Sequence, residues 1–188
     1  MTQILDGKAL ADKIVLEAKT KTDKMDKKPK LVVIQVGENP ASTVYVRNKK
    51  RACEKAGIIF EEINFPETLT QNELLNKIDE LNQDNEVSGM IVQLPIPKHI
   101  SVPLVIRQIA PHKDVDGFCA YNLGKMFLSK EFEDLPPATP LGIIKLLDEY
   151  NIDVKGMNAV IVGHSNIVGK PLATMLLNRD ATVSVCHI

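Results

Sequence analysis

LVVIQVG (31–37) is an unbroken apolar run that ends at a glycine, and it decides the fold class. Such a run is typical of a strand that is covered on both faces, as the strands of parallel sheets are. On either side of it, helix-like and strand-like segments alternate, which is the pattern expected of α/β proteins. We therefore predict an α/β fold with a mostly parallel sheet.

Local signals at helix ends and apolar periodicity predict the other elements. Thr70 and Glu73 form a capping box, which starts a helix. Thr139 as N-cap and Pro140 at the first helical position start another. We expect helices at 8–24, 44–57, 101–109 and 167–178, and two more that start at Thr70 and Thr139. We expect further strands at 58–65, 87–97, 158–163 and 181–187. Residues 111–140 are expected to form a loop.

The composition changes at about residues 137–140, where we place a domain boundary that gives domains 1–138 and 139–188. The second domain holds a single strand–helix–strand unit. A dinucleotide-binding fold of the Rossmann type is normally built from two larger βαβ halves. We therefore expect the chain to be a fragment that includes only the start of such a domain.

Composition excludes several classes of protein. The 188 residues are 44% hydrophobic and 25% charged, as in soluble globular proteins, and the net charge of −1 gives no basic field for nucleic acid or an anionic membrane. The three cysteines are widely spaced and fit a reducing compartment without a zinc site. No apolar run approaches the roughly 18 residues of a membrane span, and residues 1–8 lack the apolar stretch expected of a signal peptide. We predict a cytoplasmic protein.

The segment VYVRNKKRACEKAG (44–57) carries five Lys or Arg residues. On a helical wheel, Tyr45 and Lys49 share a small apolar face. That face also holds Ala52, Cys53 and Ala56, and the solvated side holds Arg47, Lys50, Arg51 and Glu54. An inward ammonium must be paired or lose its proton, which suits it to proton transfer. Alternatively, Lys49 extends to the rim with its stem on Tyr45.

Two further motifs have more than one interpretation. Gln93 follows the apolar run GMIV, either to contact a ligand at the carboxyl end of a parallel strand or to satisfy loop backbone. KDVDGF (113–118) supplies two carboxylates that could hold Mg²⁺, bind the N–H groups of a heterocycle or cap a turn. Because only two carboxylates are present and no calcium-loop spacing follows, we expect no metal.

VGHSNIVGKP (162–171) joins a predicted strand to a predicted helix, the context of a phosphate-binding loop. Glycine there lets the backbone approach a pyrophosphate. Ser165 replaces the second glycine of the usual G-x-G-x-x-G fingerprint, so an ordinary strand-to-helix turn is the alternative interpretation.

In their order, the blocks Y-V-x-x-K, V-Q-L-P-x-P, K-D-V-D-G and G-x-S-x-x-V-G-x-P resemble the bifunctional methylenetetrahydrofolate dehydrogenase/cyclohydrolase family, also called FolD, from Leu5 to His187. The resemblance implies an N-terminal αβα catalytic lobe that binds tetrahydrofolate derivatives, followed by the start of a Rossmann-type domain. It implies NAD(P)-dependent oxidation of 5,10-methylenetetrahydrofolate to the methenyl form, and hydrolysis of that form to 10-formyltetrahydrofolate. It also implies a homodimer, and we expect this chain to be a C-terminally truncated member.

The resemblance also assigns roles to four candidate catalytic residues. Lys49 matches the family's proton-transfer lysine, and Gln93 matches the glutamine that hydrogen-bonds near it. Tyr45 matches the tyrosine that stacks on the folate ring system. Asp116 matches the carboxylate that grips the N–H edge of the pterin.

Gly163, His164, Ser165 and Gly169 match the cofactor loop of the family. Members that use NADP often carry Arg where this chain has His164, so NADP is expected with NAD as a possible substitute. A cyclohydrolase-dominant member with a weak or NAD-linked dehydrogenase is therefore an alternative function. A nucleic-acid-binding module built on the basic residues of 44–57 is a third hypothesis, against which the balanced net charge argues.

Overall fold

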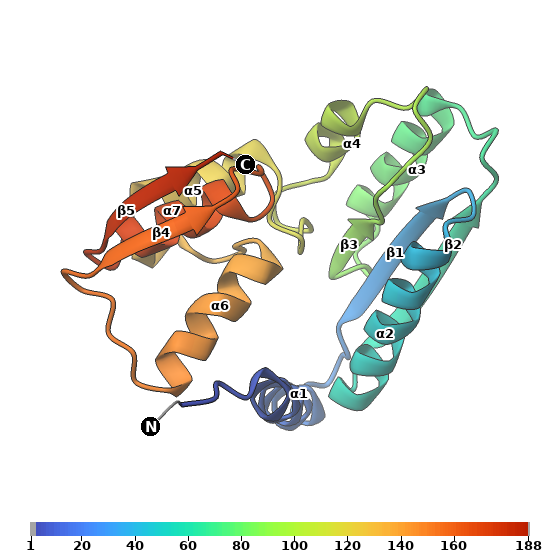
Figure 1. The fold of residues 1–188 in the computed structure, drawn as a ribbon. Helices are drawn as coiled ribbons and strands as arrows, with labels where there is room; N and C mark the ends of the chain where they lie inside the picture. Colours follow the sequence, from blue (N-terminus) through green and yellow to red (C-terminus); the bar gives the residue numbers. More distant parts are fainter. Residues whose placement is uncertain (1–2, 188) are drawn as a thin grey trace. The chain divides into compact units, whose positions relative to one another are not determined.

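The computed structural model describes residues 3–187, which form two compact units. We call residues 11–114 the first unit, and residues 3–10 with 115–187 the second unit. Both contain helices and parallel strands, which confirms the predicted α/β class (Figure 1). The functional boundary at 138/139 stays a prediction. No helix within the described residues is long and apolar enough to cross a membrane.

A three-stranded parallel sheet forms the centre of the first unit. Its strands are β1 (Lys30–Val36), β2 (Ile59–Phe65) and β3 (Gly89–Val92), in the order β2-β1-β3. Residues 32–36 of the central strand are all buried, as expected for a strand covered on both faces. Met90 and Asp114 form an isolated parallel bridge at the β3 edge.

The third strand is shorter than the predicted 87–97, because it ends at Val92. The amide of Gln93 still donates to the Ile34 carbonyl at 2.8 Å, which continues the ladder by one bond. Beyond it, Pro95 and Pro97 have no N–H to donate, so the segment cannot remain in the sheet.

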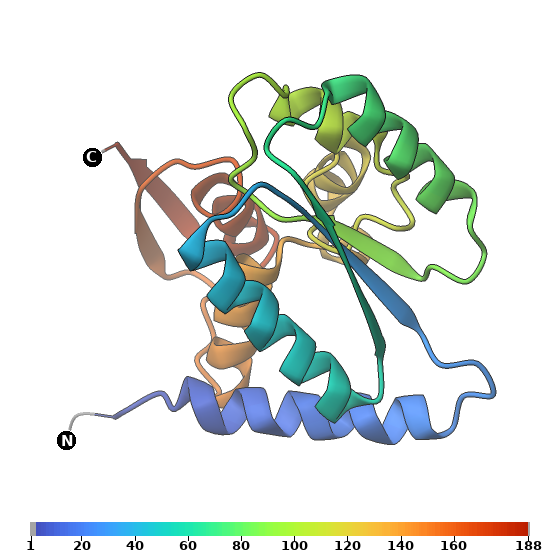
Figure 2. The ribbon, with the colours of Figure 1, turned by 90° about the vertical axis from the view of Figure 1, so that its right-hand side faces the viewer.

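Helices cover both faces of this sheet (Figure 2). The helix α2 (Pro40–Ala56) lies on one face, and α3 (Gln71–Gln83) with α4 (Val102–Gln108) lies on the other. The core on the α3 side takes alternate residues of β1 and β3. It comprises Val32, Ile34, Val36, Leu69, Leu74, Ile78, Leu81, Val87, Met90, Val92, Ile100, Val105 and Ile109.

Helix ends in the first unit follow the sequence signals. The predicted capping box is confirmed, since Glu73 N donates to the Thr70 hydroxyl and Thr70 N donates to the Glu73 carboxylate. Gly57 ends α2 in the left-handed conformation at φ 71. A Cβ at that position would lie 2.7 Å from Thr22 Oγ1, which itself donates to the Ala56 carbonyl at the end of α2. This contact joins α1 (Gly7–Asp23) to α2.

The second unit contains one βαβ crossover and three helical segments. The parallel strands β4 (Asn158–Val162) and β5 (Thr182–Cys186) flank α7 (Gly169–Leu177) in sequence. The other segments are α5 (Ala120–Leu128), η1 (Lys130–Phe132) and α6 (Ala138–Glu149). Their shared core comprises Met126, Ile144, Ile161, Leu172, Ala173, Met175, Leu176 and Ala181.

Two predictions for this unit were wrong. The expected loop at 111–140 contains α5, which buries Asn122 and Met126 and runs through the weak helix former Gly124. The helix expected to be capped by Thr139 begins at Ala138 instead, with Pro137 at the N-cap and no side-chain cap bond. The fixed φ of proline starts this helix without a hydroxyl cap.

An ion pair with no sequence signal ties η1 to the end of α7. Arg179 donates two parallel hydrogen bonds to the Glu133 carboxylate, at 3.0 and 2.9 Å. Asn178 donates to the same carboxylate and to the Met126 carbonyl. Bidentate geometry makes such a pair strong and directional.

The core on the α3 side predicts that alanine substitution of a buried and of an exposed helical leucine will change the stability of the protein by different amounts. Leu74 has no exposed surface, whereas Leu16 on α1 is 67% exposed. Leu74→Ala should lower the free energy of unfolding by about 2–5 kcal/mol, because it removes buried methylenes and leaves a cavity. Leu16→Ala should change it by less than about 0.5 kcal/mol. Urea denaturation of both variants measures this, and equal losses would contradict the packing described.

The different burial of Cys53 and Cys186 predicts which of them an alkylating reagent modifies first. Burial raises the pKa of the Cys53 thiol, the charge of Glu54 acts in the same direction, and Lys49 opposes both. Cys53 therefore carries less of the reactive thiolate at neutral pH, and it is also screened from reagent. Cys186 is exposed. N-ethylmaleimide followed by peptide mass spectrometry should label Cys186 first, and faster labelling of Cys53 would contradict this.

Candidate functional site

The predicted inward face of α2 is correct for Lys49 and wrong for two other residues. Val46 and Cys53 are buried, and Lys49 between them is half-buried. Tyr45 is 63% exposed and Ala52 is also exposed. At 100° per residue the buried direction lies between Val46 and Lys49, so Tyr45 and Ala52 fall at its rim. The expected solvated side, Arg47, Lys50, Arg51 and Glu54, is exposed.

The Lys49 ammonium donates to Gln93 Oε1 at 2.9 Å. Strand alternation explains how the two meet. Met90 and Val92 belong to the core on the α3 side, so Ile91 and then Gln93 point to the opposite face, where α2 lies. The hydrogen bond favours the inward interpretation of Lys49 over the one in which it only reaches solvent.

Gln93 satisfies loop backbone, as one interpretation of the sequence predicted, and contact with a ligand stays a prediction. Its Oε1 accepts from Lys49, and its Nε2 donates to the Leu94 carbonyl at 2.9 Å. The same carbonyl accepts from the buried Ser42 hydroxyl at 3.3 Å in the first turn of α2. The amide is therefore held at a fixed orientation with its oxygen toward the lysine.

The K-D-V-D-G motif is divided between the two units. Lys113 and Asp114 are buried in the first unit, and the Lys113 ammonium donates to the Leu81 and Asp84 carbonyls at 2.7 and 2.6 Å. These carbonyls end α3, where a cation is favoured by the helix dipole. No sequence signal indicated this role of Lys113, which lies between His112 and Asp114.

Asp116 falls in the second unit, where it is half-buried beside Gly117. Gly117 has φ 68, and a Cβ there would lie 2.4 Å from the Leu135 carbonyl oxygen. The glycine thus sets the turn that carries Asp116. Among the described residues, no three His, Cys, Asp or Glu side chains are grouped as metal ligands.

The predicted cofactor-loop residues lie together between β4 and α7. Gly163 follows β4 at φ 115, and its amide donates to the Cys186 carbonyl at 2.8 Å. Ser165 Oγ accepts from the amides of Val168 and Gly169, at 3.1 and 3.3 Å. The serine that breaks the glycine fingerprint therefore accepts from two amides at the start of α7 and fixes the loop.

Two glycines give this loop the shape that a dinucleotide needs. A Cβ on Gly169 would lie 2.1 Å from the Gly163 carbonyl oxygen, so the helix start packs directly on the turn. A Cβ on Gly163 would meet nothing within 4 Å, which leaves its outer side open to a ligand. Close helix packing and an accessible backbone are what the fingerprint glycines provide in dinucleotide-binding folds. The residues present fit such a group.

His187 is a neighbour of this loop that the sequence analysis left without a role. It follows β5, and its ring stacks on that of His164 with centroids 4.4 Å apart and an interplanar angle of 29°. The two residues follow the carboxyl ends of neighbouring parallel strands. The position of His187 directly after the second strand of the βαβ unit is the sequence signal that would have identified it as a neighbour of the loop.

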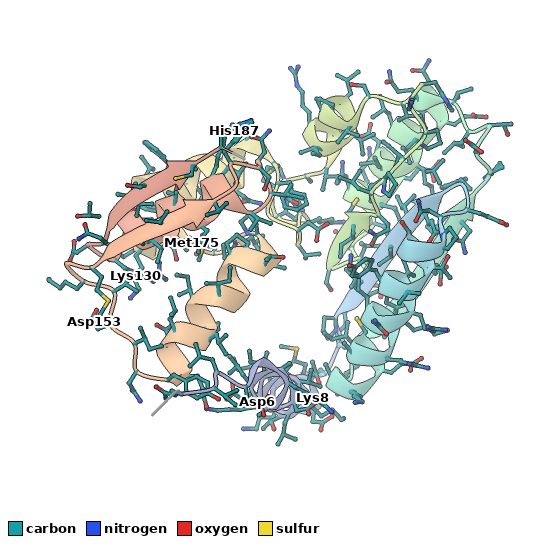
Figure 3. The ribbon with its side chains drawn as sticks, in the orientation of Figure 1. Asp6, Lys8, Lys130, Asp153, Met175 and His187 are labelled. Carbon is teal, nitrogen blue, oxygen red and sulfur yellow. The ribbon has the colours of Figure 1, made fainter. Side chains whose placement is uncertain are left out.

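A cavity of about 530 Å³ lies at the other end of the second unit, and it contains none of the predicted site residues. Lys130 and Asp153 line it, and Figure 3 shows both far from His187, at the amino ends of β4 and β5. Ligands of parallel sheets bind at the carboxyl ends, so we place the candidate site at the loop.

Fold and site together define an α/β protein with an inward lysine on its parallel-sheet unit and the first βαβ crossover of a dinucleotide-binding domain. Residues 5–116 match the tetrahydrofolate dehydrogenase/cyclohydrolase catalytic domain, and residues 137–188 match the NAD(P)-binding domain of the same family. The chain belongs to the tetrahydrofolate dehydrogenase/cyclohydrolase family, which confirms the family resemblance.

Related proteins match this chain over nearly its whole length. It is 50% identical to the bifunctional protein FolD of Methanosarcina mazei, covering 100% of this chain and 66% of that protein. The crystal structure of the FolD enzyme from Campylobacter jejuni is 51% identical, with a TM-score of 0.96 over 99% of this chain and 67% of that one. The FolD of Trypanosoma brucei, solved with NADP and an inhibitor, is 30% identical with a TM-score of 0.93, covering 99% of this chain and 64% of that one. The chain thus spans 66% of the length of the M. mazei protein.

The close approach of Gly169 to the Gly163 carbonyl predicts that glycine-to-alanine substitutions will change stability in opposite directions at different positions. Gly169→Ala should destabilise the second unit by several kcal/mol, because the new Cβ overlaps a backbone oxygen that cannot move freely. Gly142→Ala, at an open position in α6, should stabilise by about 0.5–1 kcal/mol through helix propensity. Thermal denaturation compares the two, and a neutral Gly169→Ala variant would contradict the close approach.

Proposed function

We propose that this chain forms part of a bifunctional one-carbon enzyme. Its first activity is the NAD(P)-dependent oxidation of 5,10-methylenetetrahydrofolate to 5,10-methenyltetrahydrofolate. Its second is the hydrolysis of the methenyl compound to 10-formyltetrahydrofolate. The observation that carries the proposal is the hydrogen bond of 2.9 Å between Lys49 and Gln93, which holds one amine at the carboxyl end of a parallel strand.

In the hydrolytic step, water adds to the methenyl carbon and loses a proton. Lys49 is placed to accept that proton and to return it to the ring nitrogen when the carbon–nitrogen bond breaks. The second proton of the water leaves to solvent as the formyl carbonyl forms. Gln93 keeps the amine in position, since its amide is itself fixed by the Leu94 carbonyl. A half-buried amine with an uncharged partner is better suited to this exchange than one held by a carboxylate.

Tyr45 and Asp116 complete the proposed folate contacts. The exposure of Tyr45 leaves its ring face available for stacking on a pterin. It lies one helical turn before Lys49, on the same side of α2. Asp116 supplies a carboxylate that can accept two hydrogen bonds from the N–H edge of the pterin.

The proposed cofactor site comprises Gly163, His164, Ser165 and Gly169. A nicotinamide dinucleotide bound there supplies the hydride acceptor. Gly163 presents open backbone, and Ser165 holds the helix start in place. NADP is the favoured cofactor, as supported by the NADP complex of the T. brucei relative, and NAD is the second candidate.

A cyclohydrolase-dominant enzyme is the alternative, because His164 replaces the arginine expected for NADP. Initial dehydrogenase rates with NADP and with NAD separate the two. Rapid methenyl formation with NADP would remove the alternative. We further propose a cytoplasmic homodimer without nucleic-acid or membrane partners, in keeping with the net charge of −1.

Lys49→Met should lower the rate of methenyltetrahydrofolate hydrolysis by about 10²–10⁴-fold, because it removes the proton-transfer group at nearly constant side-chain length. Lys50→Met is the matched control, since Lys50 is exposed on the same helix, and it should retain the rate. Absorbance of the methenyl compound follows the reaction. Equal rates in the parent and both variants would show that Lys49 is not the proton carrier.

A further inference from the structure

The cavity at the amino ends of β4 and β5 lies outside the proposed catalytic and cofactor sites. Its volume is about 530 Å³, and small-molecule sites range over roughly 300–1,000 Å³. Two loops that line it, 151–155 and 178–180, lead into β4 and β5. Figure 3 shows two of the lining residues, Lys130 and Asp153, at the same end of the second unit. The cavity is therefore formed within one unit and is large enough for a small molecule.

Aliphatic side chains form one side of the cavity. They are Ile144, Leu147, Ile152 and Val154. The first is buried and the other three are half-buried. An aliphatic group that covers them leaves water, which is favourable in proportion to the apolar area removed. The cavity therefore suits a ligand with an apolar part.

Contacts within the protein already occupy two of the cations that line the cavity. The Arg179 guanidinium is bound to the Glu133 carboxylate at 3.0 and 2.9 Å, and Asn178 donates to the same carboxylate. The Lys155 ammonium lies 3.1 Å from the Asp180 carboxylate. These pairs fix part of the wall and leave neither cation free for a ligand.

Three charged side chains of the lining have no such partner. Within residues 3–187, neither the Lys130 ammonium nor the Asp148 or Asp153 carboxylate forms an ion pair. The helices α6 and α7 both end at this cavity, and the partial negative charge of a helix C-terminus favours a cation. The cavity thus offers one cation and two carboxylates beside an apolar surface.

The backbone gives the cavity its shape. Among the described residues, only Asn151 and Asp180 have a positive φ without being glycine, at 54 and 61, and both line the cavity. Asn and Asp tolerate this left-handed conformation better than other side chains. Each turns the chain shortly after the end of a helix. The two turns are part of the fold, so the cavity exists before a ligand binds.

We infer that this cavity binds a small zwitterion with an aliphatic side chain, namely an α-amino acid of about the size of leucine. Lys130 binds its carboxylate, Asp148 and Asp153 bind its ammonium, and the aliphatic side chain covers the apolar side. The hydrogen bonds to both ends are charge-assisted. None of the proposed catalytic or cofactor residues lines the cavity, so the inference does not rest on the proposed function.

The distribution of charge favours a zwitterion over a ligand with a single charge. A simple carboxylate would bind Lys130 but would lie near two carboxylates and two helix C-termini, which repel it. A simple amine would use the carboxylates and leave Lys130 without a partner. Only a ligand with both groups uses all three free side chains.

The test is an NMR titration of the amide resonances of the protein with L-leucine. Saturable shifts are expected at 147–155 and 178–181 at millimolar concentration. Three probes each lack one part of leucine: isoamylamine lacks the carboxylate, isocaproate lacks the amine and glycine lacks the side chain. Each should bind at least about tenfold more weakly than leucine.

Variants assign the charged contacts. Lys130→Met should weaken leucine binding about tenfold and make leucine no better than isoamylamine. The double variant Asp148→Asn with Asp153→Asn should make leucine no better than isocaproate. Lys145→Met is the matched control, because Lys145 is exposed on α6 and does not line the cavity, and it should bind leucine as the parent does.

The absence of saturable shifts at 147–155 and 178–181 would overturn the inference, as would shifts confined to the loop at 163–169. Parent protein that binds isoamylamine or isocaproate as tightly as leucine would exclude a zwitterion site. Unchanged leucine binding in the Lys130 variant or in the double variant would also contradict it. The proposed cofactor site stands in each of these cases, since it depends on other residues.

Discussion

A parallel strand must be covered on both of its faces, and the central strand β1 imposes this condition on the first unit. Its five consecutive buried residues require helices on both sides of the sheet. Once α2 and α3 occupy opposite faces, strand alternation decides which side chains meet which helix. Gln93 shares its face with Ile91, away from the core that takes Met90 and Val92, and so it reaches Lys49.

Two lysines show how burial and partners separate a structural role from a chemical one. The Lys113 ammonium is buried and donates to two carbonyls at the end of α3, so it completes a helix end and has little freedom. Lys49 is half-buried and donates to one neutral amide. An amine with one uncharged partner can exchange a proton at lower cost than one fixed by two acceptors.

Local signals predicted much of the fold and failed where tertiary contacts override propensity. The capping box at Thr70 and the left-handed Gly57 were predictable because each depends on a few adjacent residues. The helix α5 was missed, since it is short and contains Gly124. The exposure of Tyr45 was missed because a wheel shows which residues share a face, but not where on that face the sheet lies.

The sequence by itself determined the α/β class, the helix that carries Lys49, and the loop that joins β4 to α7. These features follow from periodicity and from residues near one another in the chain. Only the tertiary structure decided that Lys113 closes α3 and that His187 stacks on His164, and it gave the geometry of the bond between Lys49 and Gln93 that the family resemblance implied. Each of these contacts joins segments far apart in sequence, and its geometry depends on strand order and register, which no local pattern encodes.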